Sequence, residues 1–135
     1  MINIEPELYN KVAELLRTKY GEEIFVTNAP VSMPDKFPAV CISEGGNTTN
    51  RNTLDSSNTE NHSNVAWEIE VYSNDQYVGR YECKQIAVFV NSLIIDHNFT
   101  RTFGDYVPNA DKSITRYVLR YTATVGKDKT IYRRS

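Results

Sequence analysis

The sequence predicts an α+β domain, in which a mostly antiparallel sheet of four to five strands carries two helices packed on one face. Three observations predict this class. A helical pattern opens the chain, an alternating strand over 65–72 leads directly into an apolar helix, and two further alternating segments close the chain. The resulting order, α, β, β, β, α, β, β, favours an antiparallel sheet with its helices gathered on one side.

The first helix is predicted to begin near Glu5 and to end before Gly21. Pro6 is tolerated in a first helical turn, and the carboxylates on either side of it complement the positive end of the helix dipole. Glycine is a common residue just past a helix end. The apolar residues recur at helical spacing as a narrow stripe: Leu8, Val12, Leu15 and Leu16. We therefore expect this helix to lie on one face of the sheet.

Two short strands are predicted next, over 24–27 and 39–43, and the second is largely apolar. The residues between them include Pro34 and Pro38, which lack backbone donors. The segment 31–38 is therefore predicted to be a connecting arm and not a member of the sheet.

The segment 65–95 organises the rest of the chain. Side chains alternate over 65–72, so one strand face is apolar while the other carries Glu68 and Glu70. Polar residues then break the strand, and a helix is predicted over 78–95. Its apolar stripe consists of Tyr81, Ile86, Val90, Leu93 and Ile94, widened by Ala87, Val88 and Phe89. We expect the apolar strand face and this stripe to pack together, at about 1.5–3 kcal/mol for each large side chain removed from water.

A β-hairpin is predicted at the end of the domain. Phe99, Arg101 and Phe103 alternate with two threonines, which predicts a strand. Residues 104–112 are predicted to form a turn, and the longest strand is predicted over 114–125. We therefore assign residues 1–125 to one domain, a size at which a single core is expected, and residues 126–135 to a basic C-terminal tail.

A long polar loop is predicted over 45–63. Leu54 is its one large aliphatic residue, which is too little apolar surface to offset the entropy of ordering the segment. Two interpretations are equally open: a surface extension of a hairpin, or a segment ordered by a partner subunit. The candidate residues for partner ordering are Asn47, Arg51, Leu54, Asp55 and His62.

Composition and charge exclude several classes. The formal net charge of -2 argues against a generic nucleic-acid binder, which usually has a marked basic excess. No apolar run approaches the roughly 20 residues of a membrane-spanning helix, and the first residues lack a secretory signal pattern, so synthesis in the cytoplasm is expected. Cys41 and Cys83 are then expected to be small, half-buried thiols and not a disulfide.

The sequence contains no pattern that predicts catalysis. His62 and His97 have no ligand or catalytic spacing to cysteine or carboxylate, and no glycine-rich phosphate loop, nucleophile elbow or paired-cysteine motif occurs. Glu68 and Glu70 share a strand face, an arrangement that a metal-dependent nuclease could use to bind its metal. Alternating carboxylates on the wet face of a strand are, however, usually just solvated. We expect no enzyme activity, no cofactor and no metal.

Basic residues cluster around the C-terminal hairpin. Arg101, Arg116 and Arg120 are spaced to share one of its faces, and Arg133 and Arg134 follow in the tail. Basic residues interleaved with tyrosines can contact nucleic acid. They can also form ion pairs between subunits, and the acidic overall charge favours this second interpretation. The candidate subunit-interface residues are Glu68, Glu70, Arg101, Arg116, Arg120, Arg133 and Arg134.

Several of these segments together resemble a family of virion proteins. The acidic strand 67–74, the helix from Gly79 through 90–93, the strand 99–101 and the strand 114–121 resemble the tail terminator or tail-completion proteins of tailed bacteriophages and prophages. The resemblance covers mainly residues 67–125 and consists of patterns of residue type, without a catalytic signature.

The resemblance implies a structural role in the virion tail. Proteins of that family form a ring, often of six subunits, which caps the tail tube, ends its polymerisation and offers a docking surface for the head. The resemblance implies three partners: copies of this chain, the tail-tube protein and a head–tail connector. It implies no membrane contact, and contact with DNA only as the DNA passes through the ring. The alternatives are a head–tail connector or stopper protein of the same virion and, from another class, a small nucleic-acid-binding protein that uses the arginine and tyrosine hairpin.

Overall fold

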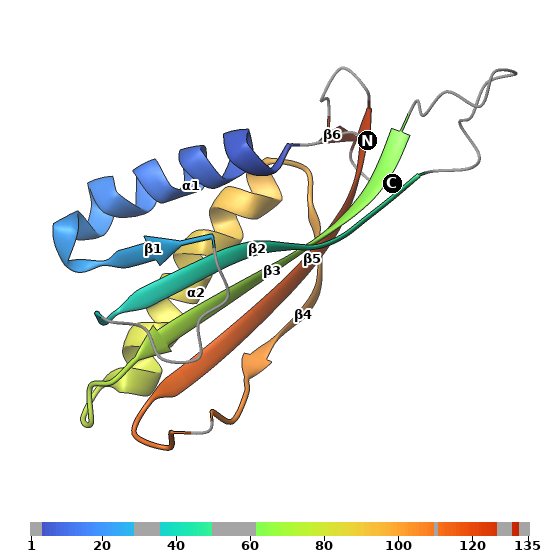
Figure 1. Cartoon of the computed structure of the whole chain (residues 1–135). Helices are drawn as coiled ribbons and strands as arrows, with labels where there is room; N and C mark the ends of the chain where they lie inside the picture. The colour runs from blue at the N-terminus through green and yellow to red at the C-terminus, as the bar shows by residue number, and fades with distance from the viewer. Residues whose placement is uncertain (1–3, 29–35, 50–61, 110, 127–130, 133–135) are drawn as a thin grey trace, which may run out of the picture.

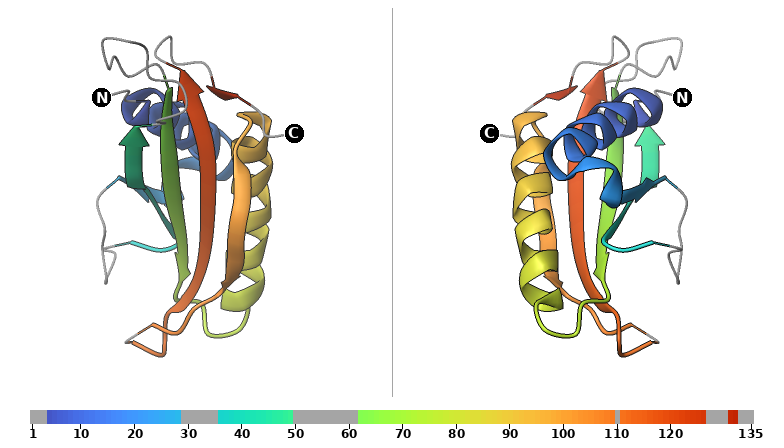
Figure 2. Two further views of the ribbon diagram at one scale, coloured as in Figure 1. Left: turned by 90° about the vertical axis from the view of Figure 1, so that its right-hand side faces the viewer. Right: turned by 90° about the vertical axis from the view of Figure 1, so that its left-hand side faces the viewer.

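In the part of the chain that the structure describes, two helices cover one face of a single sheet, as expected. The computed structural model describes residues 4–28, 36–49, 62–109, 111–126 and 131–132. The helices are α1 (Glu5–Tyr20), which continues into a short 3-10 turn (Gly21–Glu23), and α2 (Gly79–Asp96). Both lie on the same side of the sheet (Figure 1; Figure 2, right). Within the described ranges, neither helix combines the length and apolar character that a membrane crossing needs.

The sheet is antiparallel except at one edge. Its strands are β1 (Phe25–Thr27), β2 (Ala39–Thr49), β3 (His62–Ser73), β4 (Thr100–Tyr106), β5 (Thr115–Gly126) and β6 (Ile131–Tyr132). The spatial order is β1-β2-β3-β5-β4, and β6 pairs with the end of β5. β1 and β2 run parallel, while the other pairs are antiparallel. The α+β class and the mostly antiparallel sheet are confirmed.

The ends of α1 follow the predicted signals. Pro6 lies in the first turn between Glu5 and Glu7, and the last turn carries basic side chains. Gly21 has a positive φ of 79°, and its backbone N–H donates to the carbonyl oxygen of Arg17. Glycine adopts this conformation without the steric cost that a Cβ would add, which is why the helix ends here.

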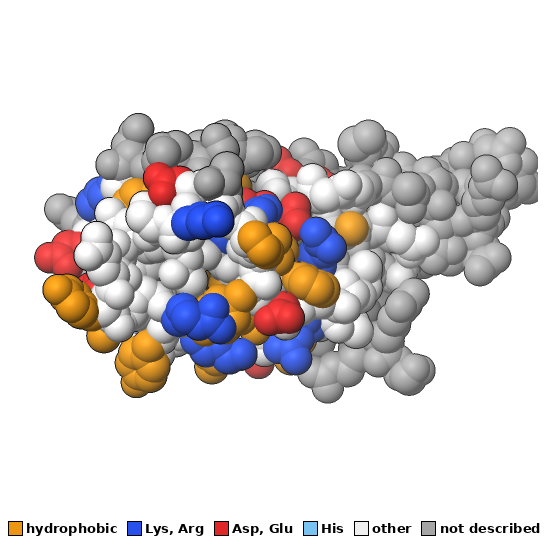
Figure 3. Space-filling view, turned by 90° about the horizontal axis from the view of Figure 1, so that it is seen from below, with side chains coloured by type: hydrophobic (Ala, Val, Ile, Leu, Met, Phe, Trp, Pro, Cys, Tyr) orange, Lys and Arg blue, Asp and Glu red, His pale blue; other side chains and the backbone are white. Residues whose placement is uncertain are grey.

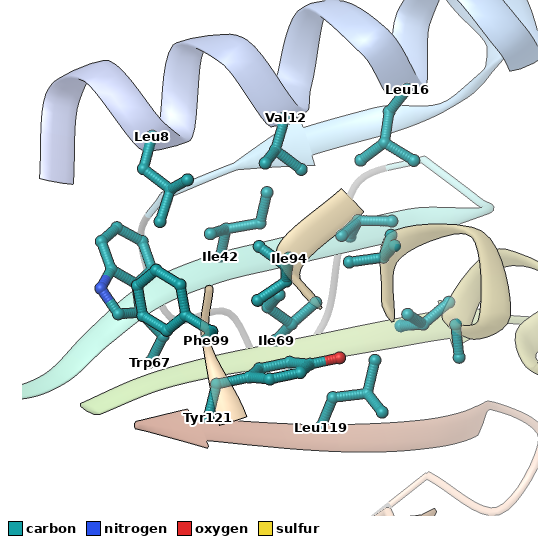
Figure 4. Close-up of a cluster of buried hydrophobic side chains, with 14 of the residues drawn as sticks. Leu8, Val12, Leu16, Ile42, Trp67, Ile69, Ile94, Phe99, Leu119 and Tyr121 are labelled. Atoms are coloured by element: carbon teal, nitrogen blue, oxygen red, sulfur yellow. The ribbon is translucent and has the colours of Figure 1, made fainter. Parts of the chain in front are cut away.

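The main core lies between the helices and the sheet. Leu8, Val12 and Leu16 of α1 point toward the sheet, where they meet side chains of β2 and β3 (Figure 4). The apolar face of β3 supplies Val65, Trp67, Ile69 and Val71, all buried as the alternation predicts. The Trp67 ring packs edge-to-face against Phe99, with 6.3 Å between the ring centroids, which is a favourable aromatic geometry.

The inner face of α2 is confirmed only in part. Its buried residues are Gly79, Cys83, Ile86, Ala87, Val90 and Ile94. Tyr81 and Val88, which the sequence analysis assigned to the core-facing stripe, are 65% and 59% exposed. At 100° per residue these two positions lie away from the line through Cys83, Ile86 and Val90, so they face outward.

The prediction of a polar loop over 45–63 is wrong at both ends of the segment. β2 continues to Thr49 and β3 begins at His62, so these ends form an antiparallel ladder in which Thr49 pairs with Ser63. Cross-strand pairing, and not apolar content, makes these residues a strand. Residues 50–61 of the predicted loop lie outside the described residues. The turn predicted over 104–112 also begins later, because β4 runs to Tyr106.

Replacing Leu16 with alanine is expected to lower the free energy of unfolding by about 2–5 kcal/mol, because a fully buried leucine leaves a cavity. Leu15→Ala is the matched control. Leu15 is the neighbouring residue of the same type and is 37% exposed, so a loss below about 1 kcal/mol is expected. Urea unfolding followed by the fluorescence of Trp67 measures both, and equal losses would contradict this packing of α1.

Candidate functional site

The sheet face that the helices leave uncovered is here called the open face, and among the described residues it carries two ion pairs. Arg120 Nε lies 3.1 Å from Glu68 Oε1, and Arg116 Nη2 lies 2.8 Å from Glu70 Oε1. Glu68 pairs directly with Arg120 in the β3–β5 register, whereas Glu70 and Arg116 are diagonal neighbours. Both pairs therefore follow from the alternation of the two strands.

The Glu70–Arg116 pair belongs to a half-buried network. The Tyr72 hydroxyl donates to the second carboxylate oxygen of Glu70. Burial, and then the hydrogen bond to Glu70, raises the pKa of Tyr72 well above its usual range. Burial would lower the pKa of Arg116, but the hydrogen bond and the charge of Glu70 outweigh this effect and raise it. Glu70 is thus satisfied by two side chains of its own chain.

These contacts bear on the predicted roles of the four residues. The sequence analysis expected the arginines to meet Glu68 and Glu70 across a subunit boundary, and the structure brings them together within one chain. In the view from below, basic and acidic side chains lie interspersed with hydrophobic ones (Figure 3). This mixture differs from the continuous basic surface that phosphate binding uses, so the nucleic-acid interpretation gains no support here.

Arg101 does not share the open face, and this part of the prediction is wrong. A register shift separates Arg101, which pairs with Tyr121, from Phe103, which pairs with Arg120. This β-bulge inserts one residue, so Arg101 turns to the helix side of the sheet. There it lines a small hollow with Lys84 and Asn91 of α2.

The two sheet edges differ from each other. Among the described residues, β4 has a strand partner on one side, β5, and all of its residues before Tyr106 are exposed. Phe103 is 36% exposed, and the Arg120 guanidinium lies 5.0 Å from its ring centroid. At the other edge, β1 covers residues Ala39 to Cys41 of β2 and no more. Exposed sheet edges of this kind carry backbone groups that another chain can pair with.

The other predicted interface residues are placed only in part. Asn47 lies in β2 and His62 in β3, so the structure describes their backbone as strand. Arg51, Leu54, Asp55, Arg133 and Arg134 lie outside the described residues. Their suggested roles stay predictions.

The side chains that could bind a metal or act as a nucleophile form a further set of candidates. The described residues contain no group of three or more His, Cys, Asp or Glu side chains that could hold a metal ion. His97 Nδ1 lies 2.6 Å from the carbonyl oxygen of Leu93 at the end of α2. Burial raises the pKa of the Cys83 thiol to about 12, so this cysteine is not an activated nucleophile.

A surface that the sequence analysis missed lies on the outer side of α2. Tyr81 and Val88 are exposed there, and Tyr77 and Val78 precede the helix with 95% and 49% exposure. The step of seven residues from Tyr81 to Val88 is two helical turns and places these two side chains on one line of α2. This spacing was the signal in the sequence, but apolar residues elsewhere on the same helix masked it.

Comparison with known proteins identifies a similar fold. No protein-family model matches the chain, and no curated protein matches it. Among solved structures, a chain from the "Virion of native gene transfer agent (GTA) particle" has a TM-score of 0.59 and 15% sequence identity. The match covers 88% of this chain and 91% of that chain. At this identity the likeness establishes the fold, along nearly the whole length of both chains.

Arg116→Ala is expected to lower the free energy of unfolding by about 1–3 kcal/mol, because it leaves the half-buried Glu70 without its charged partner. Arg120→Ala is the matched control, since the Arg120 side chain is 55% exposed and an exposed pair contributes about 0–1 kcal/mol. Chemical denaturation at neutral pH measures both. Equal losses, or a larger loss for Arg120→Ala, would contradict this ranking.

The stability of the protein is expected to fall at alkaline pH partly through Tyr72. Its pKa is raised in the folded state, so the contribution is complete below the usual tyrosine pKa of about 10 and is lost as the pH rises above it. Tyr72→Phe should flatten the pH dependence by up to about 1.4 kcal/mol per pH unit. Tyr77→Phe, at a 95% exposed side chain, is the control in denaturation series from neutral to alkaline pH. An unchanged slope in Tyr72→Phe would contradict the assignment.

Proposed function

We propose that this chain is a structural protein of a tailed-phage-like particle that assembles with copies of itself into a ring. The ring caps the tail tube, ends tail polymerisation and offers a docking surface for the head; it has six subunits, as is common in the family that the sequence resembles. The observation that carries the proposal is the fold shared with a virion chain over 88% of this chain and 91% of the other. A fold by itself does not determine function, and the surfaces of the chain supply the further support.

The two unlike sheet edges suit a ring. A ring requires heterologous contacts, in which one surface of each subunit meets a different surface of the next. The β4 edge of one copy and the β1–β2 edge of the next are two such surfaces. Bulges interrupt both, between Arg101 and Phe103 in β4 and between Glu44 and Gly46 in β2. Since bulges hinder simple strand addition, the contact is made mainly by side chains such as Phe103.

The open face has a secondary role in these contacts, because its charged side chains already pair within the chain. Glu68 and Arg120 already form a pair, as do Glu70 and Arg116. A neighbouring copy at this face would therefore meet compensated charges, which guide its orientation more than they add affinity. The tail-tube protein and a head–tail connector are the other partners, and DNA passes through the ring without specific recognition.

Particles made with and without an intact gene for this chain test the proposal. Without the chain, tails of uncontrolled length that lack heads are expected, and a tagged copy should label the head-proximal tail end in electron micrographs. Tails of normal length together with a label at the neck would support the head–tail connector alternative instead. Particles of normal form that contain no label would overturn the structural role.

A pair of variants tests the edge contact. Phe103→Asp places a charge on the exposed β4 edge and is expected to prevent complementation of the missing gene. Leu15→Asp is the matched control, because Leu15 is 37% exposed on α1 and Phe103 is 36% exposed. Thermal unfolding of both purified variants shows whether each still folds. Complementation by Phe103→Asp at the parental level would exclude the β4 edge from the ring contact.

A further inference from the structure

The outer side of α2 forms a groove with the end of α1. The groove has a volume of about 520 Å³ and is lined by Lys19, Tyr20, Tyr81, Lys84, Gln85, Val88, Phe89 and Ser92. Its floor is apolar, with the Tyr20 and Phe89 rings packed edge-to-face at 5.8 Å between centroids. It lies on the helix side, away from the open face, and its lining does not include Phe103, through which the ring contact is tested.

Four residues on the outer side of α2, here called the seam, share one line of the helix, and two of them, Tyr81 and Val88, are exposed apolar side chains. Tyr81, Lys84, Val88 and Ser92 follow one another at steps of three or four residues, as do the residues along the contact line of two packed helices. α2 already uses a different line, through Ile86 and Val90, to pack on the sheet. From Tyr81 to Ser92 the seam is roughly 16 Å long at 1.5 Å per residue, which is enough for about three turns of a second helix.

The charged groups around the seam are cations. Lys19 Nζ lies 4.4 Å from the ring centroid of Phe89, at the α1 flank of the groove. On the other flank, Lys84 Nζ donates to the Tyr117 hydroxyl at 3.1 Å, and Arg101 lies in the same hollow as Lys84 and Val88. Among the residues that the structure describes, those that line these two hollows include no carboxylate. The bulge in β4 is what places Arg101 here.

We propose that this groove binds an amphipathic helix of another protein, one that carries acidic residues beside its apolar stripe. The apolar floor would bury the stripe, while Lys19, Lys84 and Arg101 would face the carboxylates on its two flanks. A second copy of this chain fits less well. Two such grooves face to face would oppose like charges, and on α1 the exposed carboxylates Glu7 and Glu14 are interspersed with the exposed cations Lys11 and Arg17, so α1 offers no continuous acidic flank.

Designed peptides test this proposal on the isolated full-length protein. The probe is a fluorescent helix of about 18 residues with leucine along one seam and glutamate on both flanks; its partner has lysine in place of each glutamate. The glutamate peptide is expected to bind at least about tenfold more tightly than the lysine peptide. Fluorescence anisotropy measures both affinities, and amide chemical shifts should move along α2 from Tyr81 to Ser92. Equal affinities, or shifts confined to the open face, would overturn the proposal.

Variants separate the apolar and the electrostatic contributions. Val88→Asp should lower the affinity for the glutamate peptide by about tenfold or more. Leu15→Asp, the matched exposed control, should leave this affinity unchanged. The double variant Lys84→Glu with Arg101→Glu should reverse the preference toward the lysine peptide. Unchanged binding in Val88→Asp would overturn the site.

Sedimentation of the same proteins distinguishes the remaining occupant. If the parent chain forms an oligomer that Val88→Asp abolishes, a second copy occupies the groove and the proposed partner is wrong. The ring contact is tested separately through Phe103, so either proposal can fail while the other stands.

Discussion

The pairing of β3 with β5 is the constraint on which the rest of the structure depends. The two strands pair at every residue from His62, opposite Gly126, to Ser73, opposite Thr115. This register directs Trp67 and its apolar neighbours toward both helices and directs the glutamates to the open face. Because side chains alternate, a slip of one residue would turn Glu68 and Glu70 into the core. Burying these charges without partners is costly, so the two faces of β3 fix the register.

The sequence was sufficient to predict the helices and strands whose apolar residues recur at regular steps. α1, the inner side of α2, β3 and β5 each bury residues at regular steps, and these steps are visible without a structure. The ends of β2 were not predictable in this way. Residues such as Thr49 become strand because β3 lies beside them with Ser63 as a partner, and such a cross-strand contact leaves no periodic signal in its own segment. The same holds for β6, which consists of two residues of the predicted tail.

The candidate site was predictable in its chemistry and not in its geometry. Alternation along β3 and β5 places two glutamates and two arginines on one face, but the sequence analysis expected them to pair between subunits and did not anticipate the pairs within the chain. It misplaced Arg101, because a bulge depends on how two strands pair and shifts the alternation by one residue. It also misplaced Tyr81 and Val88. A helix with apolar residues on two sides does not reveal from composition alone which side meets the sheet.

Exposed apolar side chains and uncompensated charges are not spread evenly over the surface, and their positions distinguish the faces that favour contact from those that do not. On the open face, charges are compensated within the chain, so a partner there would displace interactions that already exist. On the outer side of α2 and at the β4 edge, Tyr81, Val88 and Phe103 remain exposed to water, and covering them releases that hydration. Tyr81 and Val88 lie on the helix side of the sheet, whereas Phe103 lies beside Arg120 on the open face. A protein that must contact copies of itself and other chains at the same time requires this separation, since one surface cannot serve both contacts.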